Sequence, residues 1–195
     1  MAVATLAVQQ FTGGDPTKTT VTTPRLSTAD SNNPGTTYPI PIPAADFNYS
    51  FWQSLHLTIT DIGDATLLNN HKFYSDGTVG WTLGTGGGLL VCIKSTGDCG
   101  VPVANYDQAT GTQGTTGDYS YDETDGHAYY KTGTSNASAP VSVATYTSGS
   151  QLTVDTGDHT IAEGFKGVVL QAKVADDATR GAQTAEVLTF VYDEI

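Results

Sequence analysis

The chain has 195 residues, enough for a single domain with a substantial hydrophobic core. Eight Lys and Arg against 20 Asp and Glu give a formal net charge of −12, which repels phosphate backbones and argues against nucleic acid as a partner. No apolar run approaches the roughly 18 residues of a membrane helix. Residues 1–6 lack the basic and apolar regions of a signal peptide. We therefore expect a leaderless, soluble protein that does not enter a membrane.

The first 45 residues carry only a weak pattern of alternating polarity. Prolines at positions 34, 39, 41 and 43 impose an extended path and remove backbone donors. We predict that residues 1–45 form an extended arm that contributes little to the core of its own domain and docks on another copy of the chain. The apolar residues expected to make that assembly contact are Leu6, Val8, Phe11, Ile40 and Ile42.

The pattern changes at Phe51, where apolar residues begin to alternate with polar ones. Leu55, Leu57 and Ile59 occupy odd positions, and Ser54, His56 and Thr58 occupy even ones, which predicts a half-buried strand. Short segments rich in Val, Thr and aromatic residues predict further strands at 72–74, 79–83, 89–93, 128–131, 141–146, 152–154, 168–174 and 187–192.

Helical periodicity is missing, and the best helix candidate is a single turn at 176–179. Many short strands with few helices predict an all-β fold, and we expect one antiparallel β-sandwich over residues 46–195. Its connectivity, jelly-roll or immunoglobulin-like, stays open. The polar, Gly-rich stretch from 100 to 138 predicts long surface loops, where binding would occur.

Few residues have the spacing of a reactive site. The glycines at 84–88 are followed by a strand and not by a helix, so they predict an inter-strand loop and not a phosphate loop. Cys92 and Cys99 flank good turn residues, and a disulfide and two free thiols are equally compatible with that spacing. No nucleophile, base or histidine spacing indicates catalysis, so we expect no enzyme activity and no cofactor.

Acidic and aromatic residues are interleaved in the polar loop region. Asp118, Asp122 and Asp125 are weak candidates for a calcium site, because their spacing does not match an EF-hand. The aromatic residues on predicted strands are expected in the core: Trp52, Trp81, Phe73, Tyr74 and Phe190. The loop tyrosines are the better candidates for stacking on a glycan: Tyr106, Tyr119, Tyr121, Tyr129 and Tyr130.

Four segments, spread over most of the chain, carry a family resemblance: residues 39–43 (PIPIP), 48–52 (NYSFW), 72–77 (KFYSDG) and 188–195 (LTFVYDEI). With these motifs the chain resembles uncharacterised virion-type structural proteins of tailed viruses of bacteria or archaea. Residues 174–181 (VADDATRG) are also similar to the penultimate connection of bacterial immunoglobulin-like modules.

The virion resemblance implies a capsid-associated, decoration or tail component that is assembled in the host cytoplasm. Its implied partners are copies of itself and other virion proteins, and it implies no catalytic residues. Two alternatives stay open: a carbohydrate-binding module, and a subunit of an extracellular filament or surface layer. The first predicts exposed coplanar aromatic residues, and the second predicts a head-to-tail contact between copies.

Overall fold

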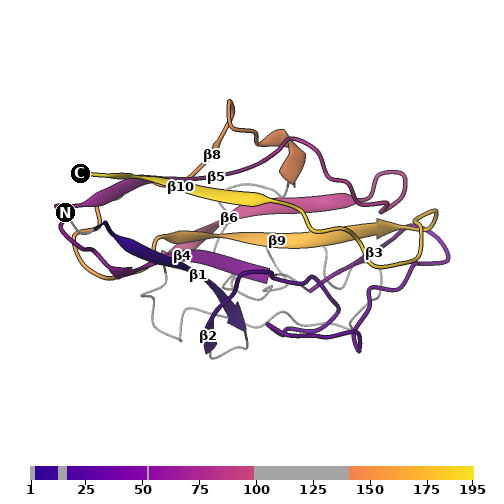
Figure 1. Ribbon diagram of the computed structural model, residues 1–195. Coiled ribbons are helices and arrows are strands. Elements are labelled where there is room, and N and C mark those ends of the chain that lie inside the picture. Colours follow the sequence, from indigo (N-terminus) through magenta and orange to yellow (C-terminus); the bar gives the residue numbers. More distant parts are fainter. Residues whose placement is uncertain (1–2, 13–16, 52, 99–140) are drawn as a thin grey trace.

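Two antiparallel β-sheets make up the fold (Figure 1). The structure, a computed structural model, describes residues 3–12, 17–51, 53–98 and 141–195, with only the backbone described at 94–98. These residues contain no α-helix, and Asp176 and Asp177 form a turn where a helical turn was the best candidate. None of them forms a helix with the length and apolarity to cross a membrane. The prediction of an all-β sandwich is confirmed.

The larger sheet has the strand order β2-β1-β4-β9-β6-β7, with β3 paired to β9 beside β4. Its strands are β1 (Thr5–Thr12), β2 (Thr17–Thr20), β3 (Phe47–Tyr49), β4 (Gln53–Asp61), β6 (Gly88–Asp98), β7 (Val141–Ser142) and β9 (Lys166–Ala175). The smaller sheet has the order β10-β5-β8. Its strands are β5 (Leu68–Ser75), β8 (Leu152–Asp155) and β10 (Leu188–Glu194), and a 3-10 turn, η2 (Val143–Thr145), follows β7.

The main core lies where the inner faces of the two sheets meet. Leu55 of β4 and Leu170 of β9 pack with Phe73 of β5 and Leu152 of β8. Alternation places Val168, Leu170, Ala172 and Val174 of β9 on this side, as the sequence predicts. A second cluster towards the chain termini consists of Ala4, Leu57, Ile59, Leu68 and Phe165.

The strand β4 is buried on both faces over its first half, and is not half-buried as predicted. Ser54 and His56, on the face opposite Leu55, are fully buried. The His56 ring stacks on Phe11 of β1, with centroids 4.3 Å apart and planes 12° apart. Because Phe11 covers the polar positions of β4, the alternation of polarity in β4 overstates the exposure of its outer face.

Part of the predicted N-terminal arm belongs to the larger sheet. Residues 5–11 pair antiparallel with β4, and β2 then pairs with β1. Phe11 is fully buried, and Leu6 and Val8 pack against the core clusters. This differs from the expectation that the first 45 residues contribute little to the core. From Val21 to Pro43 the chain forms no strand, but it turns at residues 35–37 and the Thr28 amide donates to the Tyr38 carbonyl, so this part of the predicted arm is not extended throughout.

Other predicted strands differ in their details. Residues 79–83 pair with no strand, because the backbone amides of Gly80 and Thr82 donate to side chains instead. The segment predicted at 141–146 divides into β7 and η2. The prediction misses β3, and the strand predicted at 128–131 lies outside the described residues.

Of the predicted core aromatics, Phe73 is fully buried, Trp81 and Phe190 pack against the core, Tyr74 is half-buried, and Trp52 lies outside the described residues.

Candidate functional site

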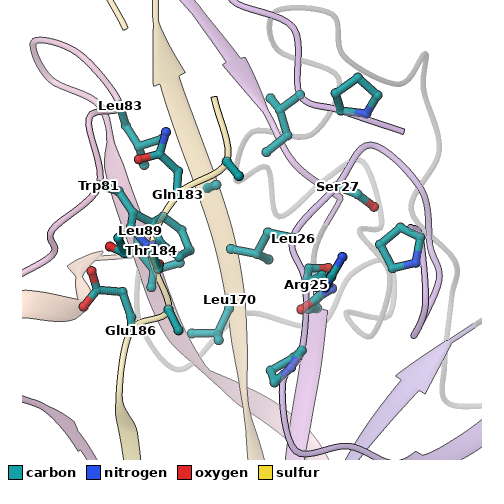
Figure 2. Close-up of a pocket in the computed structure, with 18 of the residues that line it drawn as sticks. Arg25, Leu26, Ser27, Trp81, Leu83, Leu89, Leu170, Gln183, Thr184 and Glu186 are labelled. Carbon is teal, nitrogen blue, oxygen red and sulfur yellow. The ribbon is translucent and has the colours of Figure 1, made fainter. Parts of the chain in front are cut away.

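A large groove opens on the inner face of the larger sheet, beside the smaller sheet. Its volume is about 1130 Å³. The floor consists of leucines from three strands, Leu55, Leu89 and Leu170, which continue from the main core. Figure 2 shows Leu170 between Trp81, Thr184 and Glu186 on one side and Arg25 and Leu26 on the other. The groove exists because the small sheet does not extend over this end of the larger one.

One wall of the groove is the segment between β2 and β3. The Phe51 amide donates to the Ser27 carbonyl over 2.7 Å, and the Gln53 side-chain amide donates to the Arg25 carbonyl. The Thr28 amide donates to the Tyr38 carbonyl over 3.1 Å, which folds the segment back on itself. These bonds fix an irregular chain against the start of β4 without a ladder of strand hydrogen bonds.

The opposite wall is formed by two segments: residues 79–85, which precede β6, and residues 177–186, which follow β9. Side chains of the second segment accept from backbone amides of the first: Gly80 N to Glu186 Oε1 at 2.6 Å, Thr82 N to Gln183 Oε1 at 2.9 Å, and Thr85 N to Asp177 Oδ1 at 2.7 Å. The Trp81 indole N–H donates to the Thr184 carbonyl at 2.6 Å. The wall is therefore held by side chains, which cap amides that a neighbouring strand would otherwise bind.

The hydrogen bonds at the base of this wall also hold a charge in place. The hydroxyl and the backbone amide of Thr85 both donate to Asp177, and together they lower the pKa of that carboxyl below its usual value. Gly84, beside it, has φ +82°, and a Cβ there would lie 2.3 Å from Asp177 Oδ1. The loop reading of the glycines at 84–88 is thus confirmed, and Gly84 permits the close approach of Asp177.

The charges along the groove differ from those of the whole chain. The only two arginines in the sequence, Arg25 and Arg180, both line it. Both are exposed, and neither forms an ion pair within the described part of the chain. Among the described residues that line the groove, Glu186 is the only carboxylate, and its Oε1 already accepts a hydrogen bond from the Gly80 amide. The lining itself thus carries two positive charges and one negative charge in a chain of net charge −12, with the ionised Asp177 at the base of one wall.

Only three of the five residues predicted for assembly lie together. Val8, Ile40 and Ile42 line the groove. Leu6 packs against the second core cluster, and Phe11 lies on the opposite face of the sheet against His56. Whether any of them serves assembly stays a prediction. Sequence reasoning missed the other wall of the groove, because residues 177–186 carry neither a periodic pattern nor a motif for a binding site.

The other sequence candidates fall mostly outside the described residues. Cys92 is buried, with its thiol 3.9 Å from the Val169 carbonyl. Its possible disulfide partner, Cys99, lies beyond the described range, so the disulfide stays a prediction. The weak calcium candidates Asp118, Asp122 and Asp125 and the five loop tyrosines also lie in the undescribed stretch 99–140.

Two histidines that are far apart in sequence meet near the second core cluster. His71 of β5 is fully buried, and both it and His159 pack against the Phe165 ring, with centroid distances of 4.7 and 4.4 Å. His159 Nε2 lies 3.3 Å from Asp155 Oδ2, and its Nδ1 lies 2.9 Å from Glu163 Oε1. Even so, no group of three or more His, Cys, Asp or Glu side chains in the described ranges could hold a metal ion.

Burial sets the protonation of this cluster. Desolvation lowers the pKa of His71 from 6.5 to about 4, and the effect exceeds the opposing attraction of Asp155. Burial by itself raises the pKa of Asp155. Hydrogen bonds from the Gly157 and Lys166 amides oppose that effect, as do the charges of Lys166 and His159, and together they lower the pKa below its usual value. His71 is therefore neutral and Asp155 is ionised at pH 7.

A separate polar pair, Ser54 and His56, lies on the outer face of β4. Ser54 Oγ lies 2.8 Å from His56 Nε2, and His56 Nδ1 lies 3.2 Å from the Phe165 carbonyl. Because a carbonyl only accepts, Nδ1 of the neutral ring carries the proton, and Nε2 accepts from the serine. This is the spacing of a nucleophile and its base. Both side chains are fully buried, so we interpret the pair as a hydrogen-bonded part of the core.

Comparisons with protein-family models, with curated proteins and with solved structures found no match to this chain.

Proposed function

We propose that this chain is a structural virion protein that acts by assembling with copies of itself and with other virion proteins. The observation that carries the proposal is the groove of about 1130 Å³ with an apolar floor. The floor leucines are already buried within the subunit, but the apolar wall residues Leu26, Ile40 and Ile42 are only half-buried, and a partner that covers them gains the free energy of their burial. The groove is also larger than most small-molecule pockets, which favours a protein segment as its occupant.

The lining of the groove favours binding over chemistry. It includes no histidine or cysteine from the described residues, and its one carboxylate, Glu186, is hydrogen-bonded to Gly80. The fold is a compact support for such a surface, with one irregular wall from residues 21–42 and another from 177–186. The resemblance of the chain to virion structural proteins points to the same role.

Sedimentation velocity of the full-length protein over a range of concentrations tests this proposal. We expect assemblies of many copies whose mass rises with concentration. Ile40→Asp and Ile42→Asp place a charge on the groove wall at half-buried residues outside both core clusters, so they should weaken assembly and leave folding intact. Val141→Asp, at an exposed site on β7 away from the groove lining, is the matched control. A protein that stays monomeric at every concentration contradicts self-assembly.

A carbohydrate-binding module is the second candidate, because three aromatic residues, Trp81, Tyr38 and Phe190, line the same groove. Aromatic faces stack on sugar rings, and Gln183 and Thr184 beside Trp81 offer polar groups. Affinity electrophoresis in gels containing soluble polysaccharides separates the two functions. Retardation that Trp81→Ala abolishes, in a protein that does not self-associate, would favour the carbohydrate-binding function.

A further inference from the structure

The two ends of the sandwich differ in shape and in charge. The groove lies where β9 ends, near β3, and both chain termini lie at the opposite end (Figure 1). Arg25 and Arg180 give the groove end its positive charge. A molecule whose two ends differ in this way has a direction, and contacts between unlike ends of successive copies give an open row unless the rotation between copies closes a ring.

The end with the termini presents apolar side chains to solvent. Val3, Ile161 and Ile195 are 70%, 62% and 66% exposed. The backbone around them is well fixed: Ile195 exchanges hydrogen bonds with Leu67, and the Ala4 amide donates to Glu194 Oε1 over 3.2 Å. These three residues therefore form a projecting apolar end on a rigid support.

Carboxylates surround this apolar end. Asp193 Oδ2 accepts from the Asn70 side chain at 2.6 Å, Asp158 Oδ1 accepts from Asn69 at 2.8 Å, and Glu194 accepts from a backbone amide. Their partners are neutral, so the negative charges remain uncompensated. In the described ranges, no lysine or arginine forms an ion pair with these three carboxylates.

We propose that the groove of one copy receives the terminus-bearing end of a second copy. The inference rests on the proposed function and names the occupant of the groove. Val3, Ile161 and Ile195 would cover the half-buried Leu26, Ile40 and Ile42 of the groove wall. Asp193 and Glu194 would meet Arg25 and Arg180. Apolar burial then supplies the affinity, and the charge pairs set the direction of the contact. The resulting assembly is a head-to-tail row of subunits.

Two oppositely charged double variants test the contact. Arg25→Glu with Arg180→Glu makes the groove negative, and Asp193→Lys with Glu194→Lys makes the terminal end positive. In each double variant alone, like charges face each other at every contact, and we expect self-association to weaken about tenfold or more. In an equimolar mixture the wild-type contact forms between unlike variants, so co-assembly should return. Ser148→Glu with Ser150→Glu adds negative charge at exposed positions outside the groove lining, and this control should assemble normally.

The outcomes separate this inference from the proposed function. If the wild-type protein assembles and both double variants assemble equally well, the head-to-tail contact is wrong and self-assembly stands. If each double variant is folded but the mixture does not associate, the contact is also wrong. Far-ultraviolet circular dichroism confirms folding of each variant. If the wild-type protein does not self-associate at all, the proposed function fails first.

Discussion

The His71 ring packs against the Phe165 ring with a centroid distance of 4.7 Å, and neither of its ring nitrogens forms a hydrogen bond of normal geometry. Phe190 closes the other side at 5.3 Å. The nearby Lys166 amide is already donating to Asp155 Oδ2 at 3.1 Å. A fully buried imidazole in this setting is stable only as the neutral ring.

Acid should therefore destabilise the protein through His71. The unfolded chain binds this proton with a pKa near 6.5, and the folded protein binds it only at about 4. Stability is thus complete above pH 6.5 and decreases as the pH falls towards 4, by on the order of 3 kcal/mol. Asp155, whose pKa is lowered, adds a further loss only at more acidic pH. Urea unfolding at a series of pH values measures this dependence.

The matched variant is His71→Phe, which keeps an aromatic ring between Phe165 and Phe190 and removes the titration. Its stability at pH 7 should equal or exceed that of the wild type, because two unpartnered ring nitrogens leave the core. Between pH 7 and 4.5 it should lose much less stability than the wild type. An equal loss in both proteins would assign the acid sensitivity to other groups.

Gly167→Ala should destabilise the fold by about 1–3 kcal/mol, as expected of overpacking. A Cβ at Gly167 would lie 2.5 Å from the His56 ring, which is stacked on Phe11 and hydrogen-bonded to Ser54. The ring therefore has no free direction in which to move. Gly88→Ala is the control, since a Cβ there meets nothing within 4 Å. Chemical denaturation of the two variants should give different midpoints, and equal midpoints would contradict the tight packing at Gly167.

Glu186→Ala should open the groove wall locally. The Gly80 amide is exposed apart from its hydrogen bond to Glu186, so its hydrogen exchange should accelerate about tenfold when that acceptor is removed. Gln183→Ala should accelerate the Thr82 amide instead, which makes each variant the control for the other. Exchange measured by nuclear magnetic resonance distinguishes the two amides. Equal protection in the variants and the wild type would show that these side chains do not hold the wall.

The sequence predicted β9 from the continuous apolar face of Val168, Leu170, Ala172 and Val174, although both faces of that strand are buried. It missed β1, because Ala7 and Phe11 on its outer face are as apolar as Leu6 and Val8 on its inner face. Because Gln9 and Gln10 also place a polar residue on each face, neither face of β1 is distinctly apolar and the strand has no period-two signal. The fold class survived this error because it depends on the number and type of the strands.

The groove could be predicted only in part. The alternating prolines indicated that residues 39–43 run extended, and Ile40 and Ile42 were expected to contact a partner, but the turn at residues 35–37 was not predicted. The opposite wall depends on side chains such as Gln183 and Glu186 that reach backbone amides about a hundred residues away. Such contacts leave no local pattern in the sequence. The same is true of His71 and His159, which meet only because β5 pairs with β8 and Leu68 bridges to His159.

Phe11→Ala should cost about 3–5 kcal/mol of folding stability, the usual price of removing a buried phenylalanine. Phe11 is fully buried and stacked on His56, and β1 lies between β2 and β4 in the larger sheet. Deletion of residues 1–43 should accordingly prevent folding, which is the opposite of what a separate arm predicts. Ile42→Ala is the control: Ile42 is half-buried and outside both core clusters, so its loss should cost less than about 1 kcal/mol. Urea unfolding measures the stability of both variants. If the Phe11→Ala protein is as stable as the wild type, or if the truncated chain unfolds cooperatively, residues 1–43 are a separate arm after all.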